Sequence, residues 1–240
     1  MRHDGRAEDE LRPLDLLPGF VATADGSVLF SIGQTRVICT ASVDADTPRW
    51  LRGTGRGWVS AEYGMLPAST GERKQRDSSR GRPDGRSIEI QRLIGRSLRA
   101  IVDLEALGER TVWVDCDVLQ ADGGTRCAAI CGGYVALHRA LSGLVDAGKL
   151  RELPLTAGVA AVSCGIVEGE AVLDLDYKED SSAEVDLNVV MTSGGRLVEV
   201  QGTAEGQPFD RAQLDRLLEL GAAGMQRIEA VQLQAVAAPR

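Results

Sequence analysis

The sequence predicts an α+β protein made of two related halves, each with a run of strands followed by a long helix. In the first half, strand patterns precede a helical pattern over residues 125–147. In the second half, four further strand patterns precede a helical pattern over 211–234. Residues 149–154 separate the two runs. We therefore expect an N-terminal half over 1–150 and a C-terminal half over 151–240, packed as a single compact unit.

The first strands are expected within residues 20–43, which form a meander. The dipeptide Asp25-Gly26 is a hairpin signal, and residues 33–35 predict the next turn. A loop over 44–57 and a strand over 58–65 should follow, because turn-forming residues give way to alternating polarity.

A helix is expected over residues 86–103, after an exposed loop over 67–85 that is rich in Gly, Ser, Pro and charged residues. A strand over 111–119 follows this helix. The predicted buried stripe of the helix comprises Ile90, Leu93, Ile94, Leu98 and Ile101. A second face repeats arginine at helical spacing, at Arg92, Arg96 and Arg99.

Four strands are predicted in the second half, over residues 156–167, 171–177, 185–192 and 196–202. The closing helix should begin after Asp210, whose carboxylate is the expected N-cap. Gln213 would complete a capping box, and Phe209 would pack against Leu214.

Composition points to a cytoplasmic protein. The 240 residues are 43% hydrophobic, and we find no run of about 18 apolar residues, so no membrane span is expected. Residues 1–12 are charged and lack the apolar core of a secretory signal. The five cysteines are odd in number and irregularly spaced, which favours reduced, buried thiols over disulfides or a zinc site.

Charge is distributed unevenly along the chain. The formal net charge is −8, yet residues 72–99 hold nine Arg or Lys against four Asp or Glu. Such a split predicts one anion-binding zone on an acidic body. A solvated basic loop and helix face explains the local excess equally well.

The segment over residues 120–126 runs from a strand through a glycine pair into a helix. The start of a helix presents free N–H groups and the positive end of the helix dipole. Gly124 lets the backbone approach an anion, Thr125 adds a hydroxyl, and Arg126 adds a guanidinium suited to phosphate. Arg86 is a second candidate for the same anion. On pattern alone, a strand-to-helix connection without a ligand is as good an explanation.

An acidic stretch lies over residues 173–186. Strand alternation would put Asp174 and Asp176 on one face, while Asp180 and Asp186 flank the turn into the next strand. Clustered carboxylates beside a phosphate site suit Mg²⁺, which uses one or two carboxylates together with substrate oxygens. Taken alone, the stretch favours a solvated acidic turn.

Other catalytic patterns are absent from the sequence. His3 lies in a polar segment and His138 within a predicted helix, so no nucleophile has a natural histidine partner. Neither a G-x-x-x-x-G-K-[ST] phosphate loop nor a G-x-G-x-x-G fingerprint occurs.

Together these segments resemble the ribonuclease PH family of phosphorolytic 3′→5′ exoribonucleases, over essentially the whole chain. The matching segments are residues 4–13, 57–58, 61–63, 85–96, 108–113, 120–126, 179–192 and 200–203. The resemblance implies a duplicated strand-and-helix fold of the ribosomal protein S5 domain 2-like type.

The resemblance also implies an activity. The enzyme would remove nucleotides after the CCA end of tRNA precursors, using inorganic phosphate to release nucleoside diphosphates. In reverse it would act as a nucleotidyltransferase on RNA 3′ ends, and it would take part in rRNA 3′ processing. A homohexamer of three dimers would gather six loops over 67–85 around one opening.

Residue roles follow from the same resemblance. Phosphate would be held by Arg86, Gly124, Thr125 and Arg126. Asp180 and Asp186 would be catalytic and would hold Mg²⁺. Arg73 and Arg76 match basic loop positions that bind tRNA in the family. The arginine face of the predicted helix, Arg92, Arg96 and Arg99, is expected to contact RNA as well. Three positions depart from the family pattern: Ala68 replaces a basic residue of the loop, and Cys127 and Cys131 replace threonine.

Two rival functions remain open at this stage. A non-catalytic RNA-binding ring subunit would lack the phosphate arginines or the acidic pair, whereas Arg86, Arg126, Asp180 and Asp186 are all present. A hydrolytic, metal-dependent phosphoesterase would need ligands that activate water, and the two histidines offer few.

Overall fold

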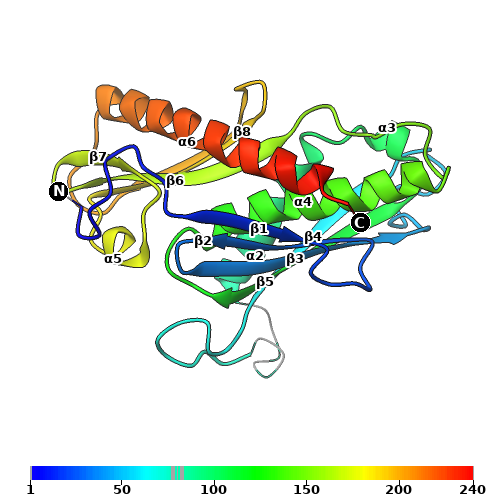
Figure 1. Cartoon of the computed structure of the whole chain (residues 1–240), viewed down its shortest axis with the longest axis horizontal. Helices are drawn as coiled ribbons and strands as arrows, with labels where there is room; N and C mark the ends of the chain where they lie inside the picture. The colour runs from blue at the N-terminus through cyan, green and yellow to red at the C-terminus, as the bar shows by residue number, and fades with distance from the viewer. Residues whose placement is uncertain (1, 77–78, 80, 82–83, 240) are drawn as a thin grey trace.

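The N-terminal half of the chain forms a five-stranded sheet with the order β1-β2-β3-β5-β4 (Figure 1). The computed structural model describes residues 2–76, 79, 81 and 84–239. All neighbouring strands are antiparallel except β4 and β5, which are parallel. The strands are β1 (Leu14–Pro18), β2 (Gly26–Ile32), β3 (Thr35–Asp44), β4 (Trp58–Met65) and β5 (Thr111–Gln120).

The C-terminal half forms a four-stranded antiparallel sheet with the order β7-β6-β8-β9. Its strands are β6 (Val159–Val167), β7 (Glu170–Leu173), β8 (Val185–Thr192) and β9 (Leu197–Ala204). The helices are α2 (Gly85–Arg99), α3 (Leu104–Leu107), α4 (Thr125–Asp146), α5 (Tyr177–Asp180) and α6 (Arg211–Ala237).

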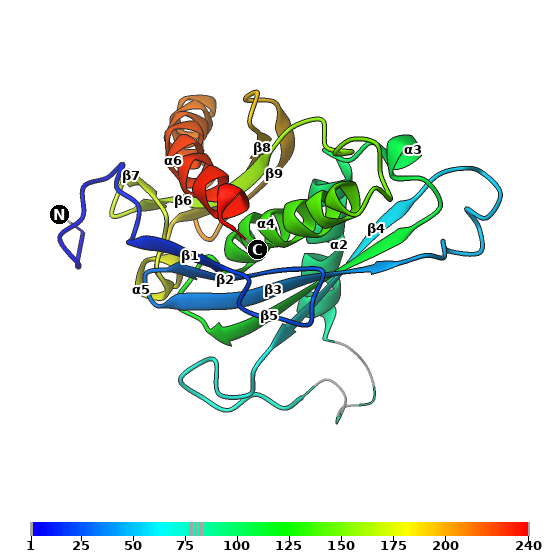
Figure 2. The ribbon, with the colours of Figure 1, turned by 45° about the vertical axis from the view of Figure 1, so that its right-hand side comes forward.

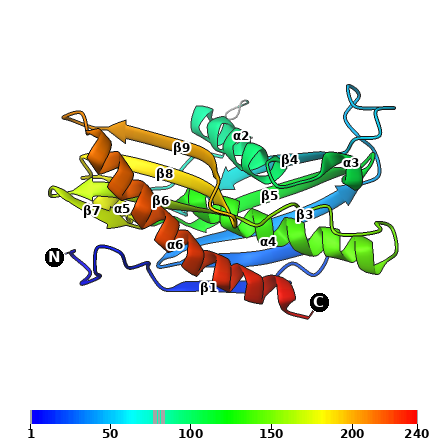
Figure 3. The same cartoon turned by 90° about the horizontal axis from the view of Figure 1, so that it is seen from above.

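Helix α4 packs against both sheets, and Figure 2 shows it above the N-terminal one. An added Cβ on Gly132 would lie 2.6 Å from Cys39 Sγ of β3, and the Cys131 thiol donates to the carbonyl of Ala161 on β6. Helix α6 packs on the C-terminal sheet and also contacts α4 and β1 (Figure 3). The Gln232 amide secures α6 to the core by donating to the carbonyls of Cys131 and Val159.

Helix α4 is long and apolar enough, by length and composition, to cross a membrane. Our expectation from the sequence that no segment comes close to a span was therefore too strict. However, 72% of its most apolar window is buried inside the protein. This burial identifies α4 as the central core helix, and its thiols at Cys127 and Cys131 are buried and free as predicted.

Several element boundaries differ from the sequence-based prediction. Strand β1 was not predicted, and it pairs with β2 across a connection over residues 19–25, so Asp25-Gly26 is not a tight hairpin turn. The helix predicted over 86–103 ends at Arg99, because Asp103 instead caps α3 by accepting from the N–H groups of Glu105 and Ala106.

The strand predicted over 171–177 is also shorter. It ends at Leu173, since Asp174 adopts φ 54° and Asp176 caps α5 through a capping box with Glu179. Asp174 and Asp176 therefore do not share a strand face, and both are buried. The capping box of Asp210 and Gln213 at the start of α6 is confirmed.

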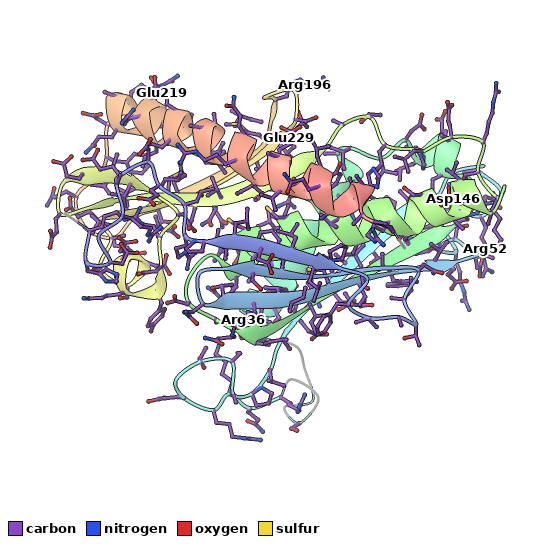
Figure 4. All side chains as sticks on the ribbon, in the orientation of Figure 1. Arg36, Arg52, Asp146, Arg196, Glu219 and Glu229 are labelled. Carbon is purple, nitrogen blue, oxygen red and sulfur yellow. The ribbon has the colours of Figure 1, made fainter. Side chains whose placement is uncertain are left out.

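The loop predicted over residues 67–85 is confirmed for residues 67–76, which contain neither helix nor strand, but Pro67 and Ser69 within it are buried; residues 77–78, 80 and 82–83 lie outside the described ones. In Figure 4 the acidic side chains Glu219 and Glu229 lie on α6, on the opposite side of the molecule from this loop. The basic loop and these two α6 carboxylates therefore lie on different sides of the molecule.

We predict that Gly26→Ala destabilises the protein by about 1–3 kcal/mol, measured by thermal or denaturant unfolding. An added Cβ would lie 2.1 Å from the carbonyl oxygen of Ala136 and 2.6 Å from the nitrogen of Ala140, both in the backbone of α4. Gly206→Ala is the control, because no atom lies within 4 Å of its Cβ. Equal stability of the two variants would show that α4 can shift freely.

Candidate active site

The turn between β5 and α4 is built on two glycines in the left-handed region, with φ 72° at Gly123 and 68° at Gly124. Thr35 braces the turn, since its hydroxyl donates to the Gly123 carbonyl over 2.7 Å and accepts from the Asp122 N–H over 2.9 Å. Because the N-cap of α4 is Gly124, no side chain caps the first N–H groups of the helix. These groups are available to an anion.

The same turn packs tightly on the acidic segment of the C-terminal half. An added Cβ on Gly123 would lie 2.6–2.8 Å from backbone atoms of Leu175, Asp176 and Tyr177. Only glycine allows this approach. The close contact brings the start of α4 next to α5, although the two segments are about fifty residues apart in sequence.

Arg12 joins these two segments through a buried ion pair. Its Nε and Nη2 donate to the two carboxylate oxygens of Asp174 over 2.9 and 2.6 Å, and Nη1 donates to the carbonyl of Asp122. Both side chains are at most 5% exposed. Arg12 thus fixes the turn between β5 and α4 relative to the acidic segment.

Helix α5 is held by the N-terminal segment. Arg2 donates to both carboxylate oxygens of Glu179 over 2.7 and 2.6 Å, and Arg6 reaches the same carboxylate over 3.2 Å. His3 lies 2.6 Å from the Asp176 carboxylate. This anchoring fixes the helix that ends at Asp180.

Asp180 and Asp186 lie close enough to Arg86 and Arg126 for the charges of these arginines to affect their pKa values. Burial, reinforced by the Asp180 carboxylate, raises the pKa of Asp186 to about 6, against the opposing charges of Arg126 and Arg86. Burial also raises the pKa of Asp180, and Arg86 and Arg126 again oppose the shift. The Asn188 amide lies 3.4 Å from the Asp186 carboxylate.

These two carboxylates fit a magnesium ion. Both lose hydration on folding and repel each other, and a divalent cation would relieve both effects. Among the described residues no group of three or more His, Cys, Asp or Glu is arranged to hold a metal. Mg²⁺ does not require one, because it accepts two carboxylates and completes its shell with water and substrate oxygens.

The arginines of the site are free to bind an anion. Among the described residues Arg86 has no hydrogen bond or ion pair, and Arg126 is tied only through Nη1, to Gln201 over 2.8 Å and Glu89 over 3.5 Å. The Tyr63 hydroxyl donates to the Thr125 hydroxyl over 2.9 Å, which fixes the first residue of α4.

The predicted RNA-binding arginines have different environments. Arg73, Arg76 and Arg92 are exposed, and Arg76 and Arg86 line the same cavity of about 250 Å³. Arg96 pairs with Glu199 over 2.6 and 2.8 Å. Arg99 is tied into the fold, since it lies 4.4 Å from the Trp58 ring and donates to the Val59 carbonyl. RNA contacts by these arginines stay a prediction.

Several site residues had no role in the sequence-based prediction. A cavity of about 1150 Å³ lies elsewhere, lined by residues 2–10, by parts of the segment over 167–182 and by α6. The supporting residues around the turn and the carboxylates are Arg12, Tyr63, Glu89, Asn188 and Gln201. Each falls in or beside a segment that matches the family, but only three-dimensional contacts reveal its partner.

Comparison with known proteins identifies the class. Models of the 3′ exoribonuclease family match the chain in two parts, domain 1 over residues 10–141 and domain 2 over residues 158–224. The chain therefore belongs to the 3′ exoribonuclease family.

Within that family the chain is of the ribonuclease PH type. It is 56% identical over 234 residues to Ribonuclease PH of Moorella thermoacetica, covering 98% of this chain and 94% of the relative. The predicted phosphorolytic exoribonuclease and nucleotidyltransferase class is thereby confirmed.

Solved structures agree on the fold. An exosome of Archaeoglobus fulgidus with RNA bound to the active site matches with a TM-score of 0.81 at 24% identity, over 95% of this chain and 91% of that chain. Rice Rrp46 matches with a TM-score of 0.78 at 21% identity, over 98% and 100%. The predicted α+β class is confirmed, whereas the division at residue 150 stays a prediction.

We predict that Arg12→Met lowers stability by about 3–5 kcal/mol, because it leaves the Asp174 carboxylate buried without its main partner. The double variant Arg12→Met/Asp174→Asn should lose less than the sum of the single losses. Asn suits the left-handed backbone of position 174. Additive losses in denaturant unfolding would contradict direct coupling.

We predict that Asp186→Asn stabilises the metal-free protein by about 1–2 kcal/mol at pH 7, allowing for solvent screening. The folded-state pKa, about 6, lies above the ordinary 3.8, so the carboxylate costs stability progressively as pH rises from 3.8 to 6. The gain should shrink to a few tenths of a kcal/mol near pH 3.5, where Asp186 is protonated in the folded state and mostly protonated in the unfolded one. Melting curves in EDTA measure it, with the exposed Glu170→Gln as control. A gain equal at both pH values would contradict the electrostatic cause.

Proposed function

We propose that this chain removes nucleotides after the CCA end of tRNA precursors by phosphorolysis, releasing nucleoside diphosphates. The observation that carries the proposal is the grouping of Arg86 and Arg126 with Asp180 and Asp186 at the uncapped start of α4. The reverse reaction would add nucleotides to RNA 3′ ends, and rRNA 3′ ends would be further substrates.

Electrostatic repulsion explains why the site needs free cations. Inorganic phosphate and the scissile phosphodiester are both anions, so they approach only where positive charge offsets their repulsion. Arg86 and Arg126 would hold phosphate through their guanidinium groups, with the N–H groups at Gly124 and Thr125. The attacking oxygen is thereby placed before any bond forms, and positioning supplies much of the rate.

Asp180 and Asp186 would hold Mg²⁺. When bound, the ion would stabilise charge that develops on the phosphoryl oxygens and the leaving 3′ oxygen. The chain's own contribution is the orientation of the two carboxylates, by α5 for Asp180 and by Asn188 and the β8 register for Asp186.

The RNA would enter past the loop that follows β4. The loop begins beside the turn between β5 and α4, since the Ala121 N–H donates to the Ser69 carbonyl over 2.8 Å. Arg73 and Arg76 on its exposed part would contact RNA phosphates. Assembly of six chains as three dimers would gather these loops around one opening, so an acidic cytoplasmic protein still offers RNA a basic entrance.

A non-catalytic RNA-binding ring subunit is the alternative function. It gains no support from the site, because the partly buried Asp186 carboxylate, whose pKa is raised by burial and by the neighbouring Asp180, costs stability without a ligand. Such an arrangement suits a reaction site better than a scaffold.

We predict that Arg126→Ala lowers phosphorolysis by at least about a thousandfold while RNA affinity changes by less than about threefold. The assay uses a tRNA with extra 3′ nucleotides and Mg²⁺, with and without inorganic phosphate, and identifies the released nucleotides. Arg196→Ala, in an exposed turn, is the control. Release of nucleoside monophosphates without phosphate would refute phosphorolysis, and no release by the wild type would favour the scaffold.

A further inference from the structure

We propose that Gln201 is a positioning residue for the attacking phosphate: it fixes the guanidinium of Arg126 so that one edge stays open to the anion. The inference rests on the proposed function, because it assumes that Arg126 holds phosphate. Gln201 lies on β9 in the C-terminal half, whereas Arg126 lies on α4 in the N-terminal half.

Among the described residues, Gln201 forms a hydrogen bond with one nitrogen of the Arg126 guanidinium and none with the other nitrogens. Its Oε1 accepts from Nη1 of Arg126 over 2.8 Å, and the Arg126 side chain is 15% exposed. In the described part of the chain, Nε and Nη2 of Arg126 have no hydrogen-bond partner. These two groups form the edge that binds phosphate oxygens in pairs. The contact therefore selects the edge that faces the anion.

Glu89 determines which way the Gln201 amide points. The amide nitrogen donates to Glu89 Oε1 over 3.0 Å. An ionised carboxylate only accepts, so the amide nitrogen must face Glu89 and the amide oxygen must face Arg126. The hydrogen bonds that link Glu89, Gln201 and Arg126 therefore allow only one orientation of the Gln201 amide.

Strand register also connects Gln201 to the carboxylate side of the site. Gln201 lies directly opposite Asn188 on β8, and Asn188 is the residue whose amide approaches Asp186. The phosphate arginine and the metal carboxylate are therefore both oriented from the same face of the β8–β9 pair.

A purely structural role for Gln201 would be to join β9 to α2. Glu199 already joins these two elements, since it accepts from Arg96 of α2 over 2.6 and 2.8 Å. Glu199 is two residues from Gln201 on the same strand, and no hydrogen bond joins it to Arg126 among the described residues. It provides a matched control in which the connection is altered and Arg126 is not.

The test measures phosphorolysis of RNA as phosphate is varied. Gln201→Ala should raise the KM for phosphate about tenfold, the effect of one lost hydrogen bond to a charged group. Gln201→Glu should raise it further, because the new carboxylate competes with phosphate for Arg126. Both variants should keep kcat at saturating phosphate, RNA affinity without phosphate, and melting temperature near wild-type values. Glu199→Gln should leave the KM for phosphate unchanged.

Three results would overturn the positioning role. The first is an equal rise of the phosphate KM in Glu199→Gln, which would assign the effect to joining β9 and α2. The second is a fall in kcat or melting temperature without a KM change. The third is an unchanged KM in both Gln201 variants while Arg126→Lys raises it, which leaves the proposed function intact. An unchanged KM in Arg126→Lys as well would refute the phosphate cradle and this inference together.

Discussion

The buried ion pair of Arg12 and Asp174 is the interaction on which the site depends, because it joins the two halves at the point where their functional segments meet. Arg12 belongs to the segment before β1, Asp174 directly follows β7, and the same guanidinium donates to the carbonyl of Asp122 in the turn between β5 and α4. The turn and the acidic segment are distant in sequence, so neither could be placed by local structure. An ion pair whose hydrogen bonds are all formed can be buried without a large loss of stability, whereas burial of one charge without a partner is strongly destabilising.

Charge pairing divides the acidic segment into two functional groups. Asp174, Asp176 and Glu179 are bound by Arg12, His3 and Arg2 of the N-terminal segment and are therefore structural. Asp180 and Asp186 have no such ion pair among the described residues, and burial raises the pKa of each. On the facing side, Arg86 and two nitrogens of Arg126 are likewise left without partners in the described chain. The fold thus pairs the three structural carboxylates with the N-terminal segment, and it leaves Asp180, Asp186, Arg86 and part of Arg126 in positions that a cation and a phosphate would complete.

The sequence predicted more of the fold than of the site's detail. Periodicity located α4, β4 and β8 nearly to the residue, since long amphipathic or alternating runs are decided locally. It misplaced the end of β7, because Asp174 leaves the strand to meet Arg12, a partner 162 residues away. Arg99 looked like a surface cation by its spacing, but Trp58 covers it in three dimensions. The spacing of residues along one helix does not show which side chain of a distant strand packs over them.

The same limit explains why an uncharged residue such as Gln201 escapes sequence reasoning. Its side chain has no chemistry that marks a site, and its partners, Glu89 and Arg126, come from two different helices. A glutamine is nevertheless suited to this position. An acidic side chain would hold Arg126 more firmly but would compete with the phosphate, and an apolar one would leave the guanidinium free to rotate. Gln201, a neutral acceptor, orients Arg126 without adding a second carboxylate to that of Glu89, which lies 3.5 Å from Nη1, so the Nε and Nη2 edge is kept for an anionic substrate.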